Sequence, residues 1–175
     1  MKINQHTVSM AMILSLMVGG TSLWAAESAT TNTETKVLSE LRKANAKEIA
    51  LGKLAEEKGA TSDIRDYGKM LAADHQKADD KVDDVARTQS ISLPAANVQN
   101  DRDIAKLQAM EGAAFDTAFL KDMKRDHDKD ISKLQMDESK LPTSSPVRRL
   151  VAQLLPTLEK HRDKAVELMN TSSAG

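Results

Sequence analysis

Three histidines interrupt apolar helical patterns and are the side chains best suited to chemistry. His75, His127 and His161 each lie on the apolar side of a separate predicted helix. Glu48 holds the same place on a fourth predicted helix. Imidazole and carboxylate groups that point inward from facing helices are the ligands with which helical bundles bind transition metals. The set predicts a site for one metal ion, with iron, manganese, zinc and copper as candidates.

The spacing along the helices places these four groups near one level. At about 1.5 Å per residue, each lies roughly 15–24 Å from one end of its predicted helix. A second interpretation stays open, in which the same groups form a buried polar network without metal. Both interpretations predict that the four side chains meet in the interior.

Aspartates close to the histidines are candidates for orienting the imidazole rings. Asp74 and Asp126 directly precede His75 and His127, and side chains of adjacent helical residues point about 100° apart. Asp79 and Asp130 follow the same histidines by four and three residues, which places them on the same helix face. The functional prediction is a hydrogen bond from a histidine to an aspartate, and the alternative is a solvated side chain.

Composition narrows the functional classes. The 175-residue chain has a formal net charge of −1, so no basic field favours nucleic acid as a partner. It has no cysteine, which excludes disulfides and thiolate metal sites. The sequence contains no HExxH motif, nucleophile elbow or glycine-rich phosphate loop. We therefore name no catalytic residue and favour a binding or structural protein over an enzyme, which stays an open alternative.

Four long helical patterns account for most of the chain. Aromatic residues make up 2% of the sequence, and no alternating strand pattern competes with the helical ones. The predicted long helices cover residues 34–58, 62–89, 113–139 and 146–170, and a short one falls within 101–110. Gly59 ends the first pattern with a tight turn, which makes the first two helices antiparallel. The prediction is an all-α, up-down-up-down four-helix bundle with a longer crossover between helices two and three.

The beginning of the chain has the pattern of an export signal. Lys2 precedes the apolar run Val8–Val18, and small residues suited to cleavage follow at Ala25 and Ala26. We predict a signal peptide over 1–26, or alternatively an uncleaved anchor. A disordered lead-in over 27–36, the bundle over 37–170 and a disordered tail over 171–175 complete the predicted domains. The mature chain has no predicted transmembrane segment, and we expect an exported protein of the periplasm or associated with the outer membrane.

Three stretches carry a family resemblance, namely "KEIALGKLAEEKGATSDIRDYGKMLAADH", "GAAFDTAFLKDMKRDHDK" and "LLPTLEKHRDKA". Together and in this order they resemble the domain of unknown function 4142 family. The resemblance implies a ferritin-like four-helix bundle in an exported bacterial protein. The polar positions that it marks are Glu48, Asp74, His75, Asp116, Asp126, His127 and His161. No glutamate is followed three residues later by histidine, so a mononuclear site is expected in place of a di-iron one.

The sequence leaves three functions open, of which a metal-dependent redox enzyme ranks last, because nothing in the sequence indicates an open coordination position or access for a substrate. The first is an exported helical bundle that binds a transition metal in its core, for metal handling or stress protection. The alternative is a structural or interaction module of the cell envelope whose polar core holds no metal. Either function leaves room for an envelope partner or for a second copy of the chain.

Overall fold

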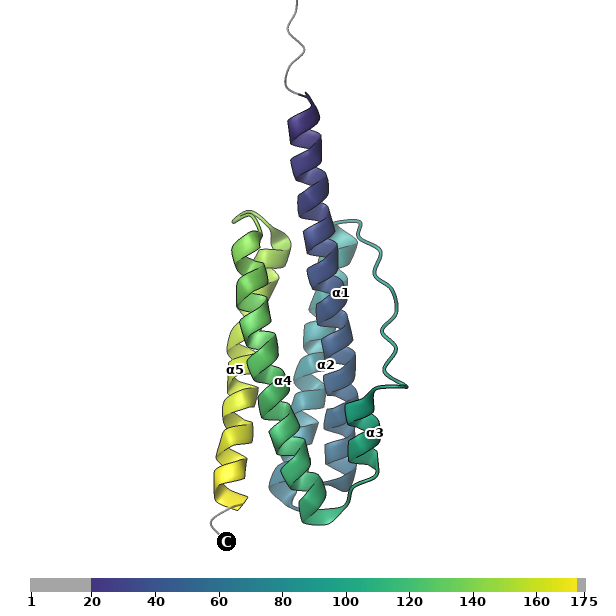
Figure 1. Ribbon diagram of the computed structural model, residues 1–175, viewed down its shortest axis with the longest axis vertical. Helices are drawn as coiled ribbons and strands as arrows, with labels where there is room; N and C mark the ends of the chain where they lie inside the picture. The colour runs from purple at the N-terminus through teal and green to yellow at the C-terminus, as the bar shows by residue number, and fades with distance from the viewer. Residues whose placement is uncertain (1–19, 173–175) are drawn as a thin grey trace, which may run out of the picture.

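The computed structural model describes residues 20–172, which form five α-helices and no strand. Four of the helices are long, and Figure 1 shows them running along the long axis of the molecule, with the short α3 beside α1. The helices are α1 (Gly20–Lys58), α2 (Ser62–Thr88), α3 (Arg102–Gln108), α4 (Gly112–Lys140) and α5 (Pro146–Ser172). The predicted all-α class is confirmed.

Capping residues explain where several helices begin. The Thr61 side chain accepts a hydrogen bond from the backbone N–H of Ile64 and so caps α2. The Asp101 carboxylate does the same for α3, accepting from the N–H groups of Asp103 and Ile104. These caps follow the signals in the sequence, so the short helix expected within 101–110 is present.

α1 begins earlier than predicted. It starts at Gly20, so residues 27–36, predicted as a disordered lead-in, are helical. Glu34 anchors this part of the helix, because its carboxylate accepts a hydrogen bond of 2.5 Å from the Ser145 hydroxyl before α5. The beginning of α1 extends beyond the other helices in Figure 1. Most of the predicted signal peptide, residues 1–19, and residues 173–175 of the predicted tail lie outside the described residues.

The directions of the helices differ from the predicted up-down-up-down order. Residues 89–101, at about 3.3 Å each, can span roughly 40 Å, which matches the 27 residues of α2 at about 1.5 Å each. The crossover therefore returns along the molecule, and α4 starts at the same end as α2 (Figure 1). A hydrogen bond of 2.9 Å from the Ala60 N–H to the Asp116 carboxylate fixes that end. α2 and α4 thus run in one direction, and α1 and α5 in the other.

The interior consists of two apolar clusters. The first, here the aromatic cluster, contains Tyr67, Phe115 and Phe119 with Leu51, Leu71, Met123 and neighbouring aliphatic residues. The second, here the aliphatic cluster, contains Val37, Leu38, Leu41, Val82, Ala86, Leu134, Leu141, Val147, Leu150, Val151 and Leu154. Among the helices over residues 20–172, none is both long and apolar enough to cross a membrane.

Candidate metal centre

Three buried imidazoles from three helices meet between the two clusters. His75 of α2, His127 of α4 and His161 of α5 are 4%, 2% and 0% exposed. Their ring centroids are 5.3–5.6 Å apart. One ring nitrogen of each histidine lies within 4.8 Å of one ring nitrogen of the others. The structure thus brings together the three histidines that the sequence singled out.

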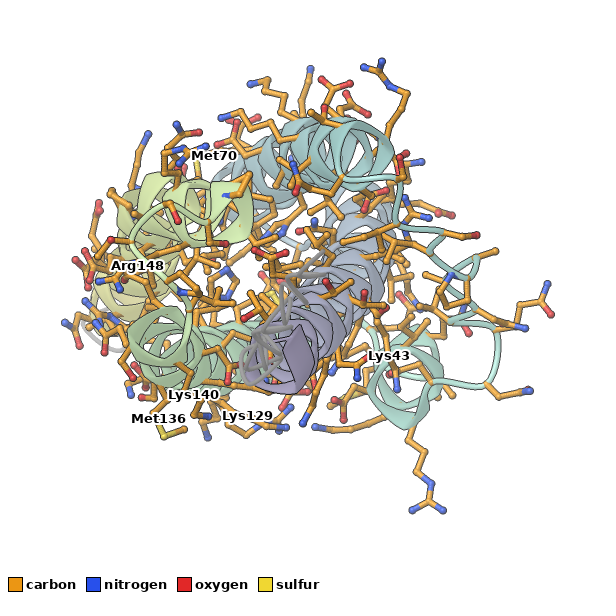
Figure 2. The ribbon with its side chains drawn as sticks, turned by 90° about the horizontal axis from the view of Figure 1, so that it is seen from above. Lys43, Met70, Lys129, Met136, Lys140 and Arg148 are labelled. Carbon is orange, nitrogen blue, oxygen red and sulfur yellow. The ribbon has the colours of Figure 1, made fainter. Side chains whose placement is uncertain are left out.

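The helix faces explain this convergence. Figure 2, seen along the long axis, shows Lys129, Met136 and Lys140 on the outer side of α4. Met136 is 57% exposed, whereas His127 on the opposite side of the same helix is buried. Helical periodicity separates the two faces, so the histidine replaces an apolar residue in the stripe that faces the other helices.

Each imidazole uses one of its two ring nitrogens for a hydrogen bond to a group outside the three rings. The Nδ1 of His127 donates to the backbone carbonyl of Met123 at 2.9 Å. The Nδ1 of His75 lies 3.0 Å from the Oδ1 of Asn45, and the Nε2 of His161 lies 3.3 Å from the Asp74 carboxylate. Carbonyl and carboxylate oxygens only accept, so these nitrogens carry the protons.

The second nitrogen of each ring is therefore a hydrogen-bond acceptor when the imidazole is neutral. These atoms are the Nε2 of His75, the Nε2 of His127 and the Nδ1 of His161. All three are buried and have no hydrogen-bond partner. Each ring thus has one buried nitrogen that is free to bind a cation, and the close group of three histidines could hold a metal ion.

Burial keeps the imidazoles in the neutral form that binds metals. Desolvation lowers the pKa of His75 well below its usual value, and the neighbouring imidazoles lower it further. The pKa of His127 is lowered to about 4, again mainly by desolvation. Burial also lowers the pKa of His161, although the Asp74 carboxylate opposes this shift. No proton has to leave these rings near neutral pH before a metal binds.

Glu48 is buried, but it is not part of the close group of ligand atoms. The described residues contain one such group, and its members are the three histidines. Glu48 is 2% exposed, and its Oε2 has no hydrogen-bond partner. Desolvation raises the pKa of its carboxyl to about 8, and the Asp126 carboxylate adds to the increase. The group is therefore largely protonated near neutral pH.

The aspartates predicted to orient the rings have different partners. Asp74 contacts an imidazole, but that of His161 on α5 and not that of its sequence neighbour. Asp126 pairs with Lys47 at 2.8 Å and with Arg125 at 2.9 Å, and so joins α4 to α1. Asp116 accepts from the backbone of the α1–α2 turn. Asp79 and Asp130 are partly buried, and no hydrogen bond joins either to a histidine among the described residues.

Two groups that hold the rings were missed by the sequence analysis. Asn45 is 4% exposed and lies three residues before Glu48 on the inner face of α1. The sequence does contain a signal for Asn45, because an amide three residues before Glu48 lies on the same face of the helix. The second group, the carbonyl of Met123, belongs to the backbone of the helix that carries His127, and the type of residue at position 123 gives no sign of it.

Comparison with known proteins supports the resemblance noted in the sequence. The family model described as domain of unknown function (DUF4142) matches residues 20–168. The chain belongs to this family. No curated protein and no solved structure matches the chain. The family description names no activity, so functional inference rests on the histidine site itself.

Proposed function

We propose that this protein binds one transition-metal ion through His75, His127 and His161. The observation that carries the proposal is the set of three buried, unpartnered lone pairs on these rings. An unsatisfied buried acceptor costs about 1–3 kcal/mol, and one cation would satisfy all three. The site therefore fits a metal by its donor atoms, its burial and its protonation.

The donor set narrows the choice of metal. Three neutral imidazoles suit zinc, copper, nickel and iron, whereas manganese favours sites richer in oxygen. The hydrogen bonds to Asn45, Asp74 and the Met123 carbonyl fix the orientation of the rings, as outer partners do in metal sites. A bound ion with three protein ligands would supply Lewis-acid or redox chemistry at a remaining open position.

Metal titration of the protein after chelator treatment tests the proposal. We expect one zinc or copper ion per chain, and His75→Ala or His161→Ala should abolish binding. Asp74→Asn should weaken affinity by about 10–100-fold, because it disturbs the ring that Asp74 orients. Glu48→Gln is the matched buried control, and binding should survive it. Elemental analysis and calorimetry that detect no metal at micromolar affinity would overturn the proposal.

The alternative is a structural role with a metal-free polar core. Its supporting observation is that each imidazole already has one hydrogen-bond partner. In that case chelator would leave the melting temperature unchanged, and added metal would not raise it. Under the metal-binding proposal, metal at about 100 times its Kd should add roughly 2.7 kcal/mol to the free energy of unfolding.

We further propose a ferritin-like four-helix bundle that acts in the periplasm or at the outer membrane, in metal handling or stress protection. The family assignment and the apolar run Val8–Val18 support this proposal. Cell fractionation and the mass of the purified chain test it, with cleavage expected after Ala25 or Ala26. Crosslinking in intact cells would reveal an envelope partner or a second copy. A full-length chain in the cytoplasm would contradict the proposed location.

A further inference from the structure

A cavity of about 160 Å³ lies beside the histidine site, with lining residues from all four long helices. Asn45 and Asp74 line it together with His75 and His161, whereas His127 does not. The cavity thus borders the groups that hold two of the rings, and it is separate from the group of three unpartnered nitrogens. Its apolar walls are Leu41, Ala44, Ala78, Leu134, Leu154 and Leu158.

The size and the walls of the cavity define what fits. An apolar cavity of about 150 Å³ in another protein holds benzene, so this one accommodates a single six-membered ring. Most of the apolar wall residues belong to the aliphatic cluster or pack against it. A ligand therefore gains affinity mainly by burying an apolar body of this size.

Charged groups in the lining are balanced in number. They are three lysines and three carboxylic acids, namely Lys77, Lys81, Lys133, Glu40, Asp74 and Asp130. Lys77 pairs with Asp74 at 2.9 Å, and Lys133 pairs with Glu40 at 2.5 Å. These four groups are already paired, and a buried charge without a partner is costly, so an uncharged ligand is favoured. The Lys77 side chain is 72% exposed, so this part of the lining reaches solvent.

The Thr157 hydroxyl is a polar group of the lining that can bind a ligand. Thr157 is partly buried on α5, and its hydroxyl has no hydrogen-bond partner among the described residues. A hydroxyl both donates and accepts, so it can pair with the hydroxyl of a ligand. One polar group in mainly apolar walls is the arrangement by which small-molecule sites orient their ligands.

We propose that the cavity binds a small cyclic alcohol or a phenol, with its ring among the aliphatic side chains and its hydroxyl paired with that of Thr157. The ring would lie against Leu41, Ala78, Leu134 and Leu154. This binding function goes beyond the proposed metal site and does not depend on it, because the ligand contacts the protein alone.

Chelator-treated protein provides the first test, so that the outcome is independent of metal binding. Phenol and cyclohexanol, both uncharged at neutral pH, should shift the methyl NMR signals of Leu41, Leu134 and Leu154 and saturate. 2-Naphthol, which has a second fused ring, and benzoate, which is an anion, should bind at least about tenfold more weakly. Absence of saturation, or equal affinity for all four compounds, would overturn the inference.

Filling the cavity provides the second test. Ala78→Leu should weaken phenol binding by at least about tenfold. Ala73→Leu is the matched control, since Ala73 is exposed on the same helix and does not line the cavity. Unchanged phenol affinity in Ala78→Leu would overturn the inference. If Ala78→Leu does not fold, the substitution at Thr157 decides.

Removing the hydroxyl provides the third test. Thr157→Val keeps the shape of the side chain and should weaken phenol binding by about three- to tenfold. Toluene, which has a methyl group in place of the hydroxyl, is the matched control, and its affinity should not fall in the variant. An equal loss for phenol and toluene, or no loss for phenol, would contradict the proposed pairing.

Discussion

The two sides of the histidine site are packed in different ways. In the aromatic cluster, Phe115 and Phe119 stack with ring centroids 5.9 Å apart and an interplanar angle of 7°, and Tyr67 packs on Phe119 at 5.8 Å. The aliphatic cluster contains no aromatic member, and part of it borders the 160 Å³ cavity. Large rings fill the space between helices on one side, whereas branched aliphatic residues leave space beside the imidazoles on the other.

The aromatic side also holds the site in place. The Tyr67 hydroxyl donates a hydrogen bond of 2.9 Å to the backbone carbonyl of His161, which ties α5 to α2 at the level of the imidazoles. The aromatic side thus contacts the histidine site through a hydrogen bond, whereas the aliphatic side leaves a cavity beside it.

We expect the largest effect from the three buried histidines, which should make the free energy of unfolding depend on pH. In the metal-free protein the pKa values of His75, His127 and His161 are lower in the folded state than in the unfolded chain. The folded state therefore binds fewer protons, and stability should fall as pH drops from 6.5 towards about 4. We expect a loss of roughly 1.4 kcal/mol per pH unit for each titrating histidine in urea unfolding. His127→Gln should give a shallower slope, and a stability independent of pH over this range would contradict the buried, neutral site.

The difference in packing predicts that shortening a side chain lowers the free energy of unfolding more in the aromatic cluster than in the aliphatic cluster. Phe119→Ala removes a fully buried ring from the aromatic cluster and should cost about 3–5 kcal/mol. Leu154→Ala enlarges a cavity that already exists and should cost about 2 kcal/mol, near the low end for such changes. Chemical unfolding of both variants at neutral pH checks the order. Equal losses would indicate that the two sides are packed alike.

The buried carboxyl of Glu48 predicts a smaller dependence of stability on pH, with the opposite sign to that of the histidines. Its folded pKa of about 8 exceeds the value of 4.5 for an unperturbed glutamate, so the folded state holds a proton that the unfolded chain releases. Stability should therefore fall as pH rises between these values, and Glu48→Gln should remove that fall. We expect the variant to gain about 1–3 kcal/mol near pH 8. A loss of stability in the variant would instead indicate that the carboxylate has a partner in the folded protein.

We expect the smallest loss of stability from a substitution at the close contact between α1 and α2. A Cβ atom added at Gly68 would lie 2.6 Å from the backbone oxygen of Gly52 and 2.7 Å from the Cβ of Ala55. Gly68→Ala should cost about 1–2 kcal/mol, because a gain in helix propensity offsets part of the clash. Thermal unfolding measures the change. A more stable variant would show that α1 and α2 can separate at this point without loss of packing.

The levels of the histidines were predictable although the helix directions were not. The predicted up-down-up-down order has α2 and α4 running in opposite directions, so the predicted distances from the helix ends refer to the wrong end for part of the molecule. His75, His127 and His161 nevertheless meet, since each lies near the middle of its helix, and reversing a helix hardly moves its midpoint. Reversing a helix exchanges the positions of its two ends. Contacts between helix ends, such as that between Ala60 and Asp116, could therefore not be predicted from the sequence.

The sequence by itself determined the helices, their inward faces and the three histidines, because periodicity and capping are local properties of the chain. Tertiary structure decided which groups hold the rings, since Asp74 contacts His161 across a helix interface and Asn45 reaches His75 from α1. It also decided that Glu48 lies outside the close group of nitrogens and that a cavity lies beside them. These features depend on distances between helices, which are set by the packing of side chains far apart in the sequence.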